Sequence, residues 1–140
     1  MVTGGGRGLG RAIVRALAEE GADVAFSYRE SRRGALDEAE AVRRLGRRCF
    51  TGPADARVPG EMVAFVEEAA DELDGLDLLV NNAGGTPPTP VLQLTDEAFE
   101  AAFHFNVTSA LNLSRQVIPY MLKRRDGSIL NISSALSYMV

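Results

Sequence analysis

The chain has 140 residues, of which 46% are hydrophobic and 24% charged, so we expect a single soluble α/β domain with a substantial core. The 19 acidic and 15 basic residues give a net charge of −4, which argues against nucleic acid and anionic membranes as main partners. No stretch approaches the roughly 20 apolar residues of a membrane span, and the single cysteine, Cys49, permits no internal disulfide. We therefore expect a cytoplasmic protein in which Cys49 is a small buried strand residue.

The hydrophobic pattern predicts strands that alternate with helices along the whole chain. Apolar stretches predict five strands, over Met1–Thr3, Val24–Tyr28, Arg48–Thr51, Leu76–Val80 and Ser128–Ile132. Amphipathic stretches predict a helix after each of the first three strands, ending at Gly21, Gly46 and Gly75. Pro59 is placed like the first-turn proline of the third helix.

The segment between the fourth and fifth predicted strands contains a loop and two helices. Gly84–Pro90 is rich in proline and predicts a surface loop. Thr95 then caps a helix over Asp96–Phe105, and a longer helix covers Val107–Lys123. The alternation of strands and helices predicts a three-layered, doubly wound parallel sheet of the Rossmann type over residues 1–140, with strand order 3-2-1-4-5.

Residues Thr3–Gly10, with the sequence TGGGRGLG, predict a phosphate-binding turn between the first strand and the first helix. Glycines at this spacing bring backbone N–H groups close to a ligand, and the helix from Leu9 adds its unpaired amides and positive dipole end. This arrangement suits a pyrophosphate. Taken alone, the glycine-rich stretch is equally consistent with a tight turn that binds nothing.

Three further stretches fall at the carboxyl ends of predicted strands, where an open α/β sheet binds its ligand. They are Asp55-Ala56, Asn81-Asn82-Ala83-Gly84 and the segment Ile129–Ser134. Together with the glycine turn they resemble the short-chain dehydrogenase/reductase family, in the family's order and spacing. The resemblance implies a dinucleotide cofactor in contact with Thr3, Gly4, Gly6, Arg7, Gly8, Leu9, Gly10, Asp55, Ala56, Asn82, Ala83 and Gly84.

The same resemblance implies a catalytic group of Asn, Ser, Tyr and Lys. Asn106 matches the asparagine that holds a water, and Ser134 matches the serine that hydrogen-bonds the substrate oxygen. The alternatives are a helix cap for Asn106 and a strand-end hydroxyl for Ser134. No Tyr-x-x-x-Lys pattern follows Ser134, and we assign no role to Tyr138 or to His104, which we place on a helix surface. We therefore expect a partial chain, truncated at both ends.

The end of the second predicted strand indicates the cofactor. Tyr28 stands where an acidic residue would bind a ribose 2′-hydroxyl, and Arg29 follows it. Arg7 precedes Gly8, and guanidinium groups pair well with phosphate, so we predict NADP(H) rather than NAD(H). The alternative is that Arg7 and Arg29 are solvated surface residues.

We accordingly expect an NADP-dependent oxidoreductase that interconverts a carbonyl and an alcohol, most similar to 3-oxoacyl-[acyl-carrier-protein] reductases. The expected partner is a small carbonyl, alcohol or acyl-thioester substrate, and no metal ligand is predicted. Two alternatives stay open, a nucleotide-binding module without catalysis and a non-catalytic pairing subunit. The apolar groups spread over more than one face of the long helix favour a homodimer or homotetramer; they are Ala110, Leu111, Leu113, Val117, Ile118 and Met121.

Overall fold

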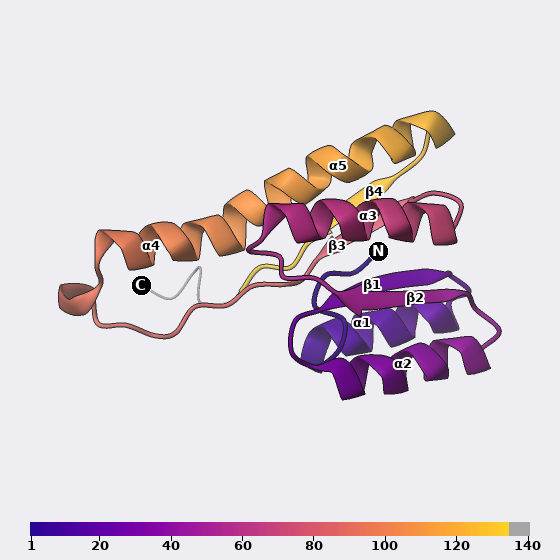
Figure 1. The fold of residues 1–140 in the computed structure, drawn as a ribbon, viewed down its shortest axis with the longest axis horizontal. Coiled ribbons are helices and arrows are strands. Elements are labelled where there is room, and N and C mark those ends of the chain that lie inside the picture. The colour runs from indigo at the N-terminus through magenta and orange to yellow at the C-terminus, as the bar shows by residue number, and fades with distance from the viewer. Residues whose placement is uncertain (135–140) are drawn as a thin grey trace.

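The computed structural model describes residues 1–134, which form a parallel sheet covered by helices on both faces (Figure 1). The helices are α1 (Gly8–Glu19), α2 (Arg32–Arg44), α3 (Pro59–Glu72), α4 (Asp96–Phe103) and α5 (Ser109–Arg124). The strands are β1 (Val24–Tyr28), β2 (Cys49–Pro53), β3 (Leu78–Asn81) and β4 (Ser128–Asn131). Short helical turns cover Val91–Gln93 (3-10) and His104–Thr108 (π).

Val2 lies at the centre of the sheet, between β1 and β3. It forms parallel bridges with Phe26 on one side and Val80 on the other, and it is fully buried. Beyond these neighbours, β2 pairs with β1 in the register Val24 to Cys49, and β4 pairs with β3 in the register Leu78 to Ser128. With the Val2 segment counted as the first strand, the predicted order 3-2-1-4-5 is confirmed.

Two apolar cores lie on the two faces of the sheet. Helices α1 and α2 cover one face, where Val14 and Val42 pack with Phe26 of β1. Helices α3 and α5 cover the other face, where Val66 and Val117 pack with Leu79 of β3. Because both faces are covered, every residue of β1 is buried, as the apolar sequence of a central parallel strand requires.

The predicted ends of the first three helices are confirmed by backbone conformation. Gly21, Gly46 and Gly75 follow α1, α2 and α3 with φ of +93°, +77° and +122°, the left-handed region that glycine adopts without strain. Pro59 begins α3, and the Thr95 hydroxyl accepts a hydrogen bond from the N–H of Ala98 at the start of α4 (3.2 Å). Local sequence signals therefore set where these helices start and stop.

The predicted break between two helices near Asn106 is wrong. Helix α4 continues through the π-helical turn into α5, and Phe103, His104, Thr108 and Ser109 all keep right-handed helical dihedrals. No glycine or proline interrupts this segment, so nothing in the backbone ends the helix there. Figure 1 shows α4 and α5 as one long helical rod that extends past the sheet.

A buried carboxylate joins α1 to α2. Glu38 of α2 is 1% exposed and accepts hydrogen bonds from Arg11 (2.7 Å) and Arg15 (2.7 and 2.9 Å) of α1. Burial raises the pKa of Glu38, but its bonds with Arg15 and Arg11 outweigh this and lower the pKa overall. The carboxylate stays ionised and fixes the position of α1, which begins at the glycine turn.

None of the helices in the part of the chain that the structure describes is long and apolar enough to cross a membrane.

Candidate functional site

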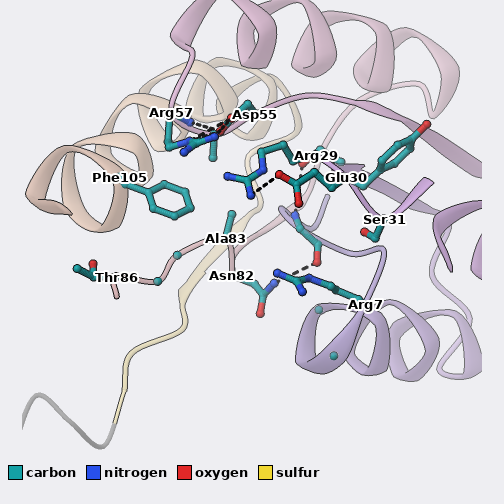
Figure 2. A pocket seen from close by; sticks show the side chains of 18 of the residues that line it. Arg7, Arg29, Glu30, Ser31, Asp55, Arg57, Asn82, Ala83, Thr86 and Phe105 are labelled. Carbon is teal, nitrogen blue, oxygen red and sulfur yellow. Dashed lines mark hydrogen bonds and ion pairs between the residues drawn. The ribbon is translucent and has the colours of Figure 1, made fainter. Parts of the chain in front are cut away.

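A pocket of about 1020 Å³ lies at the carboxyl ends of the strands (Figure 2). Its walls come from the glycine turn, from the segments that follow β1, β2 and β3, and from α4 with the π-helical turn. These segments are far apart in the sequence and meet here because parallel strands place their carboxyl ends at one edge of a sheet. The volume lies at the upper end of the range for small-molecule sites.

The glycine turn forms one end of this pocket and needs two of its glycines for different reasons. A Cβ atom at Gly10 would lie 2.3 Å from the carbonyl oxygen of Gly4, so only glycine lets α1 approach the turn this closely. Gly8 has a φ of +55° and faces open space. Arg7 precedes the first residue of α1 and makes no side-chain cap, which leaves first-turn N–H groups for an anion. The turn therefore fits a pyrophosphate.

Thr3 and Asn82 tie the glycine turn to the end of β3. The buried hydroxyl of Thr3 accepts hydrogen bonds from the N–H groups of Asn82 (3.0 Å) and Ala83 (2.8 Å). The Asn82 amide in turn donates to the carbonyl oxygens of Thr3 (2.8 Å) and Gly4 (3.4 Å). These reciprocal bonds give a physical reason for pairing a Thr-Gly motif with an Asn-Asn-Ala-Gly motif far along the chain.

The structure brings most of the predicted cofactor residues into this single pocket. The lining includes Gly4, Arg7, Gly8, Leu9, Gly10, Tyr28, Arg29, Asp55, Ala56, Asn82, Ala83 and Gly84. Thr3 and Gly6 are buried within the turn and are not among the residues that line the pocket. A Cβ atom at Gly34 would lie 2.5 Å from the Gly6 carbonyl oxygen, so Gly6 packs against the start of α2.

Three arginines surround the part of the pocket near the end of β1. Arg7 comes from the glycine turn, Arg29 from the segment after β1, and Arg57 from the segment after β2. Arg29 forms an ion pair with Glu30 (2.6 Å), and Tyr28 is 7% exposed. Among the residues that the structure describes, Arg7 has no ion-pair partner.

Asp55 and Arg57 form a second charged pair at the pocket wall. The Arg57 Nε donates to both carboxylate oxygens of Asp55 (3.0 Å each), and its backbone N–H donates to Oδ1 (2.9 Å). These bonds hold the pKa of Asp55 below its usual value, against the opposing effect of burial. The Arg57 guanidinium also lies over the ring of Phe105, 5.7 Å from its centroid. Arg57 therefore joins Asp55, one of the predicted cofactor contacts, to the π-helical turn.

Asn106 lies on the π-helical turn and fastens the loop that follows β3. Its Oδ1 accepts from the N–H of Gly85 (2.8 Å), and its Nδ2 donates to Thr86 Oγ1 (3.0 Å) and to the carbonyl of Ala102 (2.8 Å). A Cβ at Gly84 would lie 2.9 Å from this Oδ1, so the loop passes close to Asn106. Asn106 is not a helix cap, because the backbone is helical on both sides of it.

The remaining predicted residues lie at various places in the fold. Ser134 is exposed and lies two residues past Ile132, whose N–H donates to the Asn81 carbonyl (2.9 Å). It therefore follows the carboxyl end of β4, but neither Ser134 nor Asn106 is among the residues that line the pocket. His104 is exposed on the π-helical turn, as predicted. Cys49 is half-buried rather than fully buried, because β2 is an outer strand of the sheet. Tyr138 lies outside the described residues.

Sequence reasoning missed several residues of the pocket wall. They are Ser27, Glu30, Ser31, Ala54, Arg57, Gly85, Thr86, Pro87, Ala98, Ala101, Ala102 and Phe105. Only Glu30 and Arg57 had a usable signal, since each is a charged residue within two positions of a predicted ligand contact. The alanines of α4 had none. Among the described residues there is no group of three or more His, Cys, Asp and Glu that could hold a metal ion.

Comparison with known proteins agrees with this architecture. The sequence pattern of the short chain dehydrogenase family matches residues 1–140. The chain is 41% identical over 138 residues to an uncharacterized oxidoreductase of Mycobacterium tuberculosis, covering 97% of this chain and 52% of that protein. It is 33% identical over 136 residues to a 3-oxoacyl-[acyl-carrier-protein] reductase of Staphylococcus aureus, covering 97% and 55%.

A solved structure shows the same fold. A short chain dehydrogenase from Burkholderia cenocepacia in complex with NADP superimposes with a TM-score of 0.90 at 33% identity, over 99% of this chain and 56% of that one. The chain belongs to the short-chain dehydrogenase/reductase family, and its fold is the Rossmann-like α/β fold of that family. It spans about half the length of the curated relatives that it matches.

Proposed function

We propose that this chain is the cofactor-binding part of an NADP-dependent oxidoreductase that interconverts a carbonyl and an alcohol. The observation that supports this most strongly is the pair Arg7 and Arg29 on one pocket, beside a buried tyrosine where an acidic residue would favour NAD. When bound, the nicotinamide supplies the hydride chemistry, and the protein supplies position and charge. The known NADP complex of a relative with the same fold is consistent with this assignment.

Each part of the pocket then has a proposed task. The uncapped start of α1 holds the pyrophosphate, and Asp55 accepts a hydrogen bond from the adenine while Arg57 keeps its carboxylate ionised. Asn106 holds the loop after β3 in place beside the nicotinamide end. Ser134 donates a hydrogen bond to the substrate oxygen and so fixes its orientation.

Titration with both cofactors tests the proposed preference. We expect NADPH to bind at least about tenfold more tightly than NADH, because guanidinium groups pair with the 2′-phosphate. The variant Arg29→Asp is expected to reverse this order, since its carboxylate repels phosphate and accepts from a ribose hydroxyl. Equal affinity of the wild-type chain for the two cofactors would refute the NADP assignment.

The proposed substrate is a 3-oxoacyl thioester or a related ketone, on the basis of similarity to the Staphylococcus aureus reductase. Ser134 and Asn106 orient groups, but neither is a good proton source near neutral pH, and a positioned acid is typically worth about 10²–10⁴-fold. We therefore expect negligible NADPH oxidation with an acetoacetyl thioester. The same chain extended by a segment with the family's Tyr-x-x-x-Lys is expected to be active, and comparable rates from the two would refute these roles.

A nucleotide-binding module without catalysis is the alternative, and inactivity of the extended chain with bound NADPH would favour it.

For the oligomeric state, we propose that a second copy of the chain packs against an apolar row that runs along α4, the π-helical turn and α5. The exposed members of this row are Phe99, Phe103, Val107, Leu111, Ile118 and Leu122, whereas Leu113, Val117 and Met121 are buried. Sedimentation of the extended chain as a monomer at micromolar concentration would contradict this. A cytoplasmic location remains part of the proposal.

A further inference from the structure

Glu30 forms an ion pair with Arg29, the arginine that we expect to bind the 2′-phosphate, and no other carboxylate among residues 1–134 pairs with Arg29. Its Oε1 lies 2.6 Å from Nη2 of Arg29, and both residues line the pocket. Figure 2 shows the two side chains pointing toward one another at the pocket wall, on the segment that follows β1. The Glu30 carboxylate therefore occupies a guanidinium edge that a phosphate would otherwise use.

The charges around Glu30 alternate in sign. Arg57 lies on the neighbouring loop and pairs with Asp55, and its pKa is raised chiefly by that hydrogen bond, with a smaller contribution from Glu30. Arg29 and Arg57 are thus each neutralised by a carboxylate close in sequence. A phosphate of charge near −2 entering beside Arg29 would meet the Glu30 carboxylate as well as the guanidinium.

The Arg29–Glu30 pair is exposed, which determines how strongly it opposes a ligand. The Arg29 side chain is 43% exposed and the Glu30 side chain 76% exposed. Exposed ion pairs of this kind contribute little to stability, so a phosphate that pairs with the guanidinium in forked geometry is able to displace the carboxylate. Because Glu30 directly follows Arg29 in the chain, the displaced carboxylate stays close to the phosphate and continues to repel it.

We propose that Glu30 determines cofactor specificity by competing with the cofactor 2′-phosphate for Arg29, which weakens NADPH binding and leaves NADH binding unchanged. This inference rests on the proposed function, because it assumes that a dinucleotide binds with its adenosine ribose beside Arg29. Arg29 strengthens NADPH binding in this proposal, and Glu30 weakens it. The pocket then accepts both cofactors more evenly than its arginines alone would allow.

The variant Glu30→Gln tests this with little change of shape. A matched control is Glu40→Gln, because Glu40 forms an equally close and exposed ion pair with Arg44 on α2 and does not line the pocket. NADPH and NADH dissociation constants are measured by nucleotide fluorescence for the wild-type chain and both variants, at low and at moderate salt. We expect Glu30→Gln to tighten NADPH about 3–10-fold, with a smaller gain at higher salt, and NADH to change by less than about twofold.

The outcomes separate this inference from the proposed function. Unchanged NADPH affinity in Glu30→Gln, or equal tightening of NADPH and NADH, would overturn the role of Glu30 while leaving cofactor binding intact. An equal gain in Glu40→Gln would also overturn it, because the effect would then reflect net charge alone. If the wild-type chain binds neither nucleotide, the proposed function fails and this inference fails with it.

Discussion

Arginine–carboxylate pairs differ between the two ends of the parallel strands. We call the border of the sheet where the strands begin the amino-end edge, and the border where they end the carboxyl-end edge. At the amino-end edge, Arg48 bonds Asp23 (2.8 Å), Asp74 (2.7 Å) and the carbonyls of Glu72 (3.3 Å) and Leu73 (3.1 Å). These partners lie 24 to 26 residues away in the sequence. One side chain therefore joins the segment before β1 to the end of α3.

At the carboxyl-end edge the pairs are local. Arg29 pairs with the next residue, and Arg57 pairs with Asp55 two residues before it. Apart from the contact of Arg57 with the Phe105 ring, these pairs do not join distant segments, and they leave the guanidinium groups on a pocket wall where a ligand is able to compete for them. Distant pairs at one edge support the fold, and local pairs at the other edge remain available for binding.

The largest effect is expected at the carboxyl-end edge from Gly10→Ala. The added Cβ would lie 2.3 Å from the Gly4 carbonyl and 2.5 Å from Asn82 Nδ2, so α1 must move away from the glycine turn. We expect NADPH affinity to fall at least about 100-fold, together with a loss of stability of about 1–3 kcal/mol. Fluorescence titration measures the first quantity and urea unfolding the second.

Gly60→Ala is the matched control for this variant. Gly60 lies in the first turn of α3, and a Cβ there would have no atom within 4 Å. Alanine is expected to leave NADPH affinity unchanged and to stabilise the chain slightly, since it favours a helix by up to about 1 kcal/mol. NADPH affinity that survives in Gly10→Ala would show that the turn does not contact the cofactor.

The next largest effect is expected at the amino-end edge from Arg48→Ala. This change removes the side-chain bonds to Asp23 and Asp74 and leaves the Leu73 carbonyl without its donor. We expect the thermal midpoint to fall by about 3–6 °C with NADPH affinity unchanged.

Arg57→Ala at the carboxyl-end edge is expected to change NADPH affinity instead of stability, with little change in the midpoint and NADPH affinity about 3–10-fold weaker. The same response in both variants would remove the distinction between the two edges.

Acid titration sharpens the same comparison. The hydrogen bond with Arg48 lowers the pKa of Asp23 in the folded chain, so the stabilisation is complete above the unfolded value near 4 and is lost as the pH falls through the lower folded value. The gap in thermal midpoint between wild type and Arg48→Ala should therefore shrink steadily below about pH 4. A gap that is constant from pH 7 to pH 2.5 would show that the Asp23 carboxylate contributes nothing.

Much of the fold and of the pocket was predictable because its determinants are local. The strand order follows from alternating strands and helices, and the glycine turn, Asp55 and Asn82 each follow a strand whose position an apolar run indicates. Residues at the carboxyl ends of parallel strands must lie together, so their meeting in one pocket needed no knowledge of side-chain packing.

The parts that sequence could not predict depend on packing between distant segments. Phe105 reaches the pocket because α4 continues through a π-helical turn. The residue types in that turn predict neither the continuous helix nor the π-helical geometry. Asn106 suggested a helix start because asparagine favours caps, but its amide bonds the Ala102 carbonyl within the helix instead. The choice of Glu30 as the partner of Arg29 is likewise a property of folded side-chain positions.

The smallest effect is expected at Cys49, which reports opening of the amino-end edge because it follows Arg48 in the chain. Burial raises the pKa of the Cys49 thiol to about 11, so only about one thiol in a thousand is ionised at pH 8. We expect slow alkylation by iodoacetamide in the wild-type chain, a rate a few-fold higher in Arg48→Ala, and the wild-type rate in Arg57→Ala. Mass spectrometry of samples quenched over time gives the rates, and urea-unfolded chain gives the upper limit. Equal acceleration in the two arginine variants would mean that the edges open together, and the local pairs around the pocket would then support the fold as much as the distant ones do.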